Sequence, residues 1–359
     1  MRIAQVAPLY EAVPPAAYGG TERVIGALCD ELVTAGHEVT LFASAGSVSD
    51  AHIEVMCSGP LRLHMTRSEL ERIAPHLHLE MLASVFARSG DFDVIHAHTD
   101  IWTLPFARDS STPTLLTMHG RLDLPEVRAL LPRYRDVSLA SVSDYQRFPV
   151  VDLDLPWAAT CYNGLDLDAY LAEPTSPGGD YLAFVGRITP EKRPDWAVEV
   201  ARRAGMPLKV AAKIDPLDLE YWNETIAPIF AANDVEFVGE LTEDAKPSFM
   251  AGAAALLFPI DWPEPFGLVM VEAMAAGTPV IALDRGSVPE VVQDGVSGTI
   301  CHTLDDMVAA VDTAAGFDPA ACRAVARRFT ARNMARRYVE VYRDITRAGR
   351  LVPLASSPR

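Results

Sequence analysis

Short apolar runs alternate with longer amphipathic stretches along the whole sequence of 359 residues. A short apolar run bounded by turn residues is typical of a buried strand, and the amphipathic stretch that follows it is typical of a helix. Such βα units assemble into a parallel sheet covered by helices. The alternation therefore predicts the α/β class, and the length favours two domains over one.

The predicted strands form two series with one break between them. The first series comprises residues 2–8, 39–43, 93–97, 114–118 and 138–142. The segment EPTSPGGD, residues 173–180, interrupts every periodicity with prolines and glycines, so the interdomain linker is placed there. The second series reads YLAFVGRI, LKVAAKI, VEFVGEL, AALLFPI, PVIAL and SGTICH. We therefore expect one domain over residues 1–172 and a second over residues 173–330.

Composition argues against several kinds of partner. The chain has 31 Lys and Arg against 48 Asp and Glu, a formal net charge of −17 that repels nucleic acid and anionic lipid head groups. The five cysteines form no CxxC pair, which predicts free thiols in a reducing compartment. No apolar run approaches the roughly 18 residues of a membrane span. We expect a soluble, cytoplasmic protein with no nucleic-acid partner and no stable membrane association.

The C-terminal stretch, residues 321–350, is rich in arginine and carries Met334, Tyr338, Tyr342 and Ile345 at helical spacing. Such a stretch is either a basic surface for an anionic partner or a terminal helix whose apolar stripe packs on the rest of the chain. The second interpretation is preferred here.

Ligands of open parallel sheets bind at the carboxyl ends of the strands, so the loops there are candidate sites. Gly19 and Gly20 precede the first amphipathic helix, where free backbone N–H groups favour an anion, although a plain helix cap gives the same pattern. His119 follows the strand at residues 114–118 and offers one directed hydrogen bond, although lone histidines are usually structural. The GxGxxG fingerprint is absent from the first loop, which argues against a dehydrogenase.

Cations follow the first strand of the second series. The segment VGRITPEKRPD brings Arg187, Lys192 and Arg193 close together in an acidic chain. Arginine binds a phosphate as a fork and lysine binds it as a point charge. An ordinary exposed helix start would show the same residues, so the segment alone leaves both interpretations open.

The segment FPIDWPEPFGLVMVEAMAAGTPVIA is the most informative one. A buried strand leads into a proline-rich loop with Glu264, then Gly267, and then a helix that contains Glu272. The N–H groups of Leu268 and Val269 would be free at the helix start. Glu272 would lie roughly 7 Å further along the helix axis. Two carboxylates on either side of an anion-binding helix end suit a ligand with hydroxyl groups at both ends, which is the form of a sugar nucleotide.

The run EPFGLVMVE, residues 264–272, resembles the E-x7-E motif of the retaining family 4 glycosyltransferases, which have the GT-B fold. Six further pieces occur in the order expected for that family: YGGTERV, MHG, NGLDLDAY, VGRITPEKRPD, AGTPVIA and PEVVQDGVSG. The resemblance spans nearly the whole chain. It implies two Rossmann-like domains that face a central cleft, with the final helix, within residues 331–359, crossing back to the first domain.

The resemblance also implies roles for the matching residues. Gly20, beside Gly19, would contact the donor diphosphate, and His119 would touch a sugar hydroxyl near the reacting centre. Arg187 and Lys192 would neutralise the diphosphate. The family often reads EKG where this chain has Glu191, Lys192 and Arg193, which puts the backbone geometry of that turn in question.

The same resemblance assigns the residues of the E-x7-E segment. Glu264 and the backbone of Phe266, Gly267 and Leu268 would hold the donor sugar, with Val269 in the same helix start. Glu272 would bind the ribose hydroxyls of the nucleotide.

The implied reaction moves a hexosyl unit from a nucleoside diphosphate, expected to be UDP, to an acceptor hydroxyl with retention of configuration. The leaving phosphate can serve as the base, so no protein nucleophile is assigned. Neither a metal nor another cofactor is expected, because the cations already neutralise the diphosphate. The DLD triplets at residues 152–154 and 166–168 match a metal-diphosphate motif of a different glycosyltransferase fold, but such triplets are common in acidic chains.

Three alternatives remain open. Two are enzymes of the same fold, a sugar-nucleotide epimerase and a phosphorylase, and the third is a non-catalytic nucleotide-sugar-binding protein. The acceptor site is expected within residues 44–80, where His64, His76 and His78 show no metal spacing. Composition does not identify the acceptor.

Overall fold

The computed structural model describes residues 1–16, 19–173 and 179–351, and these residues form two compact units. The first unit contains Met1–Pro15, Gly19–Gly164 and the segment from Ala331, and the second unit contains Ala16 and Leu165–Thr330. The predicted linker at residues 173–180 lies largely outside the described residues.

The units divide between Gly164 and Leu165, earlier in the chain than the expected boundary after residue 172. Two contacts explain the difference. The Leu165 N–H donates to the Phe329 carbonyl at 3.0 Å. The helix α6 (Asp168–Ala172) packs on α10 (Lys246–Ala251) and α11 (Leu268–Ala276) of the second unit. The segment that the sequence assigned to the end of the first domain therefore belongs to the second unit.

The first unit has a sheet of seven parallel strands in the order β3-β2-β1-β4-β5-β6-β7. Its strands are β1 (Arg2–Val6), β2 (Glu38–Ser44), β3 (His52–Cys57), β4 (Val94–Ala97), β5 (Thr114–Met118), β6 (Ser138–Ser141) and β7 (Trp157–Thr160). The sequence predicted five of these and missed β3 and β7, the two edge strands.

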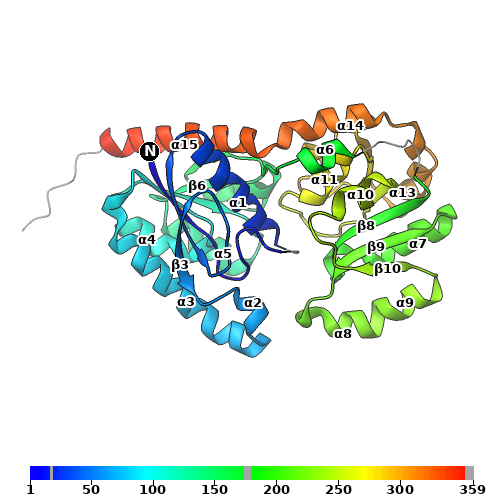
Figure 1. Ribbon diagram of the computed structural model, residues 1–359, viewed down its shortest axis with the longest axis horizontal. Helices are drawn as coiled ribbons and strands as arrows, with labels where there is room; N and C mark the ends of the chain where they lie inside the picture. Colours follow the sequence, from blue (N-terminus) through cyan, green and yellow to red (C-terminus); the bar gives the residue numbers. More distant parts are fainter. Residues whose placement is uncertain (17–18, 174–178, 352–359) are drawn as a thin grey trace, which may run out of the picture. The chain divides into compact units, whose positions relative to one another are not determined.

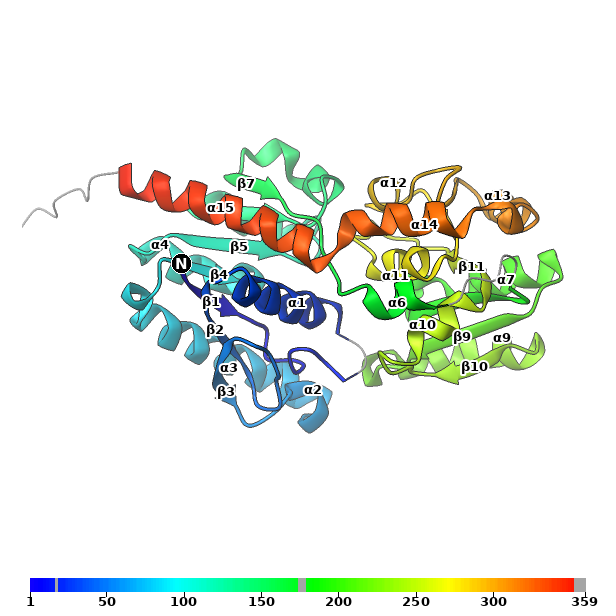
Figure 2. The same ribbon diagram turned by 45° about the horizontal axis from the view of Figure 1, so that its top comes forward.

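Helices cover both faces of this sheet (Figure 1, Figure 2). The long helices α1 (Gly20–Thr34) and α15 (Ala331–Leu351) pack side by side on one face. The helices of the other face and its loops are α2 (Leu61–His64), α3 (Arg67–Ala87), α4 (Leu104–Asp109) and α5 (Pro125–Leu130). Tyr338 and Tyr342 of α15 are fully buried, in keeping with the packed stripe preferred from the sequence.

The two faces of the first sheet differ in polarity. Side chains alternate between faces along a strand, and Ala4, Val6, Ile95 and Leu116 belong to an apolar core together with residues of α3 and α4. On the opposite face, β1, β4 and β5 each carry one polar residue with no exposed surface, Gln5, His96 and Thr117, among apolar residues such as Ile3 and Leu115. A buried polar row of this kind requires hydrogen-bond partners.

The second unit has a sheet of six parallel strands in the order β10-β9-β8-β11-β12-β13. Its strands are β8 (Tyr181–Arg187), β9 (Leu208–Lys213), β10 (Glu236–Gly239), β11 (Ala253–Phe258), β12 (Val280–Leu283) and β13 (Gly298–Cys301). These match the second predicted series.

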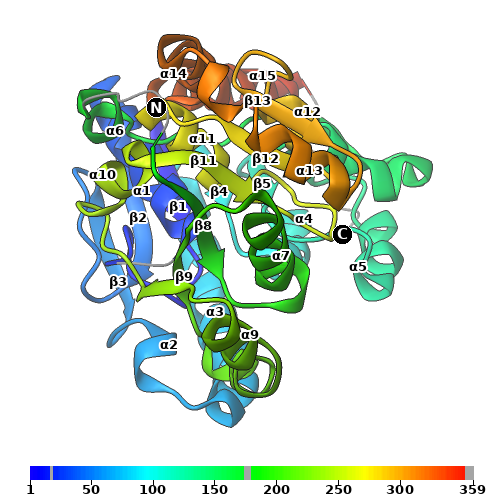
Figure 3. The ribbon, with the colours of Figure 1, turned by 90° about the vertical axis from the view of Figure 1, so that its right-hand side faces the viewer.

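Two helical layers cover the second sheet (Figure 3). The helices α7 (Pro194–Ala204), α9 (Ala227–Ala232) and α13 (Leu304–Val311) lie together on one side, and α10 (Lys246–Ala251), α11 (Leu268–Ala276) and α14 (Pro319–Ala326) lie together on the other. The short helices α8 (Leu219–Tyr221) and α12 (Val288–Val291) complete the unit. Helix α11 is buried on nearly all sides, which explains why its sequence lacks a polar face.

Two further observations concern the whole of the described chain. All five cysteines are free thiols. Among the described residues, no helix combines the length and the apolar character needed to cross a bilayer.

Candidate functional site

The start of α11 is the centre of the candidate site in the second unit. Gly267 caps the helix with φ +78°, a left-handed conformation that glycine adopts readily and other residues do not. No side chain caps the helix, and its first turn holds no acid. The Met270 N–H already donates to the Gly267 carbonyl at 3.0 Å. The N–H groups of Leu268 and Val269 are therefore the ones placed to meet an anion.

Glu264 lies in the loop before α11 and is almost fully buried, with 8% of its surface exposed. The Lys192 ammonium donates to Glu264 Oε2, and the Trp262 indole N–H donates to the same oxygen at 3.1 Å. Lys192 Nζ also lies 5.6 Å from the ring centre of Phe258 and 5.4 Å from that of Trp262. The fold thus brings together Lys192 and Glu264, which are far apart in the sequence, next to the rings of Phe258 and Trp262.

The loop after β12 forms hydrogen bonds with the backbone of the Glu264 segment. The sequence did not predict this contact. The Ser287 N–H donates to the Glu264 carbonyl at 2.9 Å, and Ser287 Oγ donates to the Phe266 carbonyl at 2.8 Å. A Cβ at Gly286 would lie 2.3 Å from the Glu264 carbonyl oxygen, so only glycine fits there. The signal available in the sequence is a Gly-Ser pair shortly after a buried strand.

Glu272 lies on the second turn of α11 and is 2% exposed. Its Oε1 is 4.0 Å from Lys246 Nζ, and Lys246 also pairs with Glu243 at 2.6 Å. The carboxylate is therefore held close to a cation inside the unit. The predicted ribose contact requires a nucleotide that reaches this depth beside α11.

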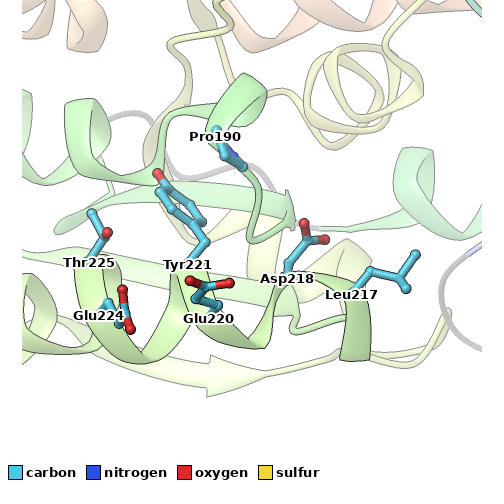
Figure 4. A pocket seen from close by; sticks show the side chains of 7 residues that line it. All are labelled: Pro190, Leu217, Asp218, Glu220, Tyr221, Glu224 and Thr225. Atoms are coloured by element: carbon cyan, nitrogen blue, oxygen red, sulfur yellow. The ribbon is translucent and has the colours of Figure 1, made fainter. Parts of the chain in front are cut away.

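Arg187 ends β8 as predicted, and its Nε lies 3.5 Å from Asp218 Oδ2. This Nε is buried and makes no hydrogen bond. Asp218 also lines a pocket of about 320 Å³ next to Pro190 and Tyr221 (Figure 4). The other lining residues are Leu217, Glu220, Glu224 and Thr225. Its three carboxylates, those of Asp218, Glu220 and Glu224, would repel a phosphate, so this pocket does not suit a diphosphate.

Arg193 stands where the family often has glycine, and its φ is +52°. This left-handed conformation costs a non-glycine residue about 1 kcal/mol or more. Arg193 pairs with Asp195 through two hydrogen bonds of 2.9 and 2.7 Å and with Asp261 at 3.2 Å, and its guanidinium stacks 3.5 Å from the ring centre of Trp196. The turn therefore keeps a glycine-like backbone that side-chain contacts stabilise, and Lys192 stays in place.

The start of α1 is the corresponding feature of the first unit. Gly19 caps α1 with φ +154°, and a Cβ there would lie 2.8 Å from Pro15 Cγ. Glu22, in the first turn, is buried and already places a carboxylate near the positive end of the helix. The Gly19–Gly20 site thus offers close backbone approach but a weaker positive potential than the start of α11.

His119 lies at the carboxyl end of β5, as predicted. Its backbone N–H donates to Asp100 Oδ1 at 3.4 Å, and its Nε2 lies 2.8 Å from Nδ1 of His98. Burial lowers the pKa of His119 to about 4, so the imidazole is neutral at pH 7. Burial raises the pKa of Asp100 to about 6, although the N–H groups of His119 and Gly120 act in the opposite direction.

His98 and Asp100 were missed by the sequence reasoning. Both belong to the run HAHTD at the end of β4. His96 and His98 are two residues apart in this run, which is the spacing of side chains on the same face of a strand. Two histidines at that spacing in an otherwise apolar strand are the signal that could have found them.

The DLD triplets occupy surface positions with protein partners. Asp152 pairs with Arg128 at 2.8 Å, Asp154 pairs with Arg135 at 3.3 Å, and the Asp166 carboxylate accepts from the Asp168 N–H at 3.0 Å. Across residues 1–16, 19–173 and 179–351, no three potential metal ligands cluster together.

The segment expected to hold the acceptor, residues 44–80, forms β3, α2 and most of α3. His78 is structural, because its Nε2 accepts from the Leu9 N–H at 2.9 Å and its Nδ1 donates to the Ala74 carbonyl at 2.7 Å. His76 is exposed and bonds the Arg72 carbonyl at 2.8 Å.

Comparison with known proteins covers both units. Residues 172–315 match the family described as glycosyl transferases group 1, and residues 18–168 match glycosyltransferase family 4. The phosphatidyl-myo-inositol mannosyltransferase of Mycolicibacterium smegmatis is 28% identical, over 87% of this chain and 84% of that protein. The D-inositol 3-phosphate glycosyltransferase of Mycobacterium marinum is 25% identical, over 78% of this chain and 70% of that protein.

Solved structures resemble the chain over nearly its whole length. AviGT4, a glycosyltransferase involved in avilamycin A biosynthesis, is 25% identical with a TM-score of 0.70, over 97% of this chain and 98% of that one. The sucrose-phosphate synthase of Thermosynechococcus elongatus has a TM-score of 0.76 at 20% identity, over 97% and 99% of the two chains. HepE of Anabaena, solved with UDP-glucose, has a TM-score of 0.71 at 17% identity, over 96% and 100%.

Proposed function

Because the chain belongs to the family 4 glycosyltransferases and has the GT-B fold, we propose that it transfers a hexosyl unit from a nucleoside diphosphate sugar to a hydroxyl group with retention of anomeric configuration. UDP is the proposed nucleotide. The main electrostatic task of such a reaction is to stabilise the negative charge that develops on the leaving diphosphate.

The pairing of Lys192 with Glu264 beside the uncapped start of α11 is the observation that carries this proposal. An ammonium has three N–H donors. Lys192 can therefore keep its bond to Glu264 while it donates to a phosphate oxygen held by the Leu268 and Val269 N–H groups. The cation is in place before the donor binds, so little reorganisation opposes the reaction.

The two carboxylates of the E-x7-E segment have separate proposed tasks. Glu264 accepts hydrogen bonds from hydroxyls of the donor sugar, with the backbone of Phe266 and Gly267 alongside. Glu272 accepts from the ribose hydroxyls of the nucleotide. Charge-assisted bonds of this kind are about twice as strong as neutral ones.

Arg187 is proposed to neutralise the diphosphate together with Lys192. Its buried Nε lies 3.5 Å from Asp218 Oδ2 and makes no hydrogen bond, so a phosphate oxygen that reaches this N–H would give it a hydrogen-bond acceptor.

We assign no protein nucleophile and no metal. The leaving phosphate acts as the base for the incoming hydroxyl, which approaches on the same face of the sugar. The Gly19–Gly20 backbone and the neutral imidazole of His119 contribute hydrogen bonds and no net charge.

The acceptor is proposed from the relatives alone. The two mycobacterial relatives reported above carry inositol in their names. Inositol compounds are therefore the first acceptors to test.

The deciding experiment incubates the full chain with UDP-glucose, UDP-galactose, GDP-mannose and ADP-glucose, with and without myo-inositol 1-phosphate. Melting temperature reports donor binding, since a ligand at about 100 times its Kd stabilises the native state by about 2.7 kcal/mol. Released nucleoside diphosphate reports turnover, and the anomeric proton of the product reports configuration. We expect a UDP sugar to bind and to be consumed in the presence of EDTA. A donor that binds and is never consumed would instead indicate a non-catalytic binding protein.

A further inference from the structure

A buried row of polar side chains crosses the first sheet beneath α15. Gln5 of β1 and His96 of β4 are register partners, and Thr117 lies on the next strand, β5. None of the three has exposed surface. Each of the three forms a hydrogen bond with a tyrosine of α15, either Tyr338 or Tyr342, and both tyrosines are fully buried.

A continuous chain of hydrogen bonds links this row to His119. His119 Nε2 lies 2.8 Å from His98 Nδ1, and His98 Nε2 lies 2.9 Å from Gln5 Oε1. The Gln5 amide donates through Nε2 to the Tyr342 hydroxyl at 3.0 Å. The Tyr342 hydroxyl then lies 2.6 Å from His96 Nδ1.

The far end of the chain continues across β5. His96 Nε2 lies 2.7 Å from Thr117 Oγ1, and Thr117 Oγ1 lies 3.0 Å from the Tyr338 hydroxyl. The chain therefore runs from a loop at the carboxyl end of β5 to the C-terminal helix.

The direction of the bonds nearest His119 follows from the chemistry of Gln5. The amide oxygen can only accept, so His98 must carry its proton on Nε2. A neutral His98 then has a lone pair on Nδ1 and can only accept there. The His119 Nε2 must therefore be the donor, which leaves Nδ1 of a neutral His119 without a proton.

We propose that Gln5 and His98 are positioning residues that fix His119 in the Nε2–H tautomer, so that its Nδ1 acts as a hydrogen-bond acceptor. The Gln5 amide donates through Nε2 to Tyr342 and presents its oxygen to His98. The role in transfer rests on the proposed function, whereas the tautomer itself does not.

The surroundings of the chain keep its histidines neutral. Burial lowers the pKa of His96 and of His98 well below the usual value. The nearest acid, Asp100, contacts the backbone of His119 and not its ring. Within the described part of the chain, the one hydrogen bond of the His119 ring is the bond at Nε2. Nδ1 is thus the ring atom left for a ligand.

The consequence for recognition is a requirement on the ligand. A lone pair at Nδ1 accepts a hydrogen bond from a sugar hydroxyl and repels a group that only accepts, such as an ether oxygen. The opposite tautomer would reverse this preference. A substitution of Gln5 would therefore change whether His119 Nδ1 accepts a hydrogen bond from a substrate hydroxyl or donates one to it.

The test uses the full chain with ¹⁵N-labelled histidine and long-range ¹H–¹⁵N NMR, which identifies the protonated ring nitrogen. The variant H119N identifies the signal of His119. We expect the Nε2–H tautomer in the wild type and a mixture of tautomers in Q5L, which removes the acceptor. The control Y338F removes a hydroxyl at the far end of the chain and should leave His119 unchanged.

Turnover supplies a second readout. In Q5L, kcat should fall about tenfold while the donor KM stays near the wild-type value, and Y338F should keep wild-type kcat. An Nδ1–H tautomer in the wild type would overturn the proposal, as would an unchanged tautomer in Q5L. The wild-type spectrum decides the case even if Q5L does not fold. A wild type without turnover would count against the proposed function and not against the tautomer.

Discussion

The carboxyl ends of the two sheets carry different kinds of chemistry. In the second unit, Lys192 and Glu264 meet as charged groups beside a helix start. In the first unit, His119 and His98 meet as neutral rings whose pKa values burial keeps low. Fixed charge suits a diphosphate, and neutral directed hydrogen bonds suit hydroxyl groups. Under the proposed function, the second unit supplies the charge for the diphosphate and the first unit supplies hydrogen bonds for hydroxyl groups.

Lys192→Ala tests the charged half of this comparison and has the largest expected effect. Removing the cation should lower turnover about a hundredfold, because one such contact supplies about 3 kcal/mol of transition-state stabilisation. The measurement is kcat together with the melting temperature.

Lys209→Ala is the matched control for that variant, since Lys209 pairs with Glu236 at 3.2 Å on neighbouring strands away from α11. It should keep wild-type turnover. Equal rates for the two variants would remove Lys192 from the site.

Gly286→Ala tests whether the loop behind Glu264 sets the position of that carboxylate. The new Cβ would collide with the Glu264 carbonyl, whereas Gly295 has nearly the same positive φ, +72° against +60°, and open space around its Cα. Both substitutions place alanine at a positive φ, so they share the backbone strain. The difference between the two variants therefore measures the effect of the collision alone.

We expect Gly286→Ala to lose about 1–3 kcal/mol more stability than Gly295→Ala, and to lose turnover about tenfold. Denaturant unfolding and kcat measure the two effects. Identical behaviour of the two alanine variants would show that the loop after β12 does not position Glu264.

Acidification should weaken the first unit before the second, with the smallest effect of the three. Burial lowers the pKa of His96, His98 and His119, and that of His78 to about 4. Below about pH 6.5 these histidines become protonated in the unfolded chain but stay neutral in the folded protein. The free energy of unfolding therefore falls as the pH drops toward 4. Asp100, with its pKa raised to about 6, acts in the opposite direction but is one group against four.

Hydrogen exchange at pH 7 and pH 5 measures this effect. Protection should fall in β4 and α15 and stay nearly constant in α11 and β12, because the second unit contains one histidine, His302, at an exposed position. A loss of protection that begins in α11 would contradict the expectation.

The sequence predicted the central strands well because each is a buried apolar run. It missed β3 and β7, the edge strands of the first sheet, and β7 is a strand of four residues of which only one is fully buried. The strand β3 contains no fully buried residue, so no continuous apolar run marks it.

The predicted site follows the same logic. The residues around α11 are contiguous in the sequence, so Glu264, Gly267 and Glu272 were found together. The chain of hydrogen bonds behind His119 joins Gln5 to Tyr342, which is 337 residues away. Local patterns contain no trace of such a pairing, and only the packing of α15 on the sheet reveals it.

The discontinuity of the first unit has a consequence for biosynthesis. Its sheet is translated before the whole second unit, whereas α15, which covers the polar row of Gln5, His96 and Thr117, is translated after it. Until then those side chains lack their tyrosine partners. The first unit therefore completes its native structure only after Ala331–Leu351 has been synthesised, and a nascent chain stalled ahead of Ala331 would expose a target for chaperones and proteases.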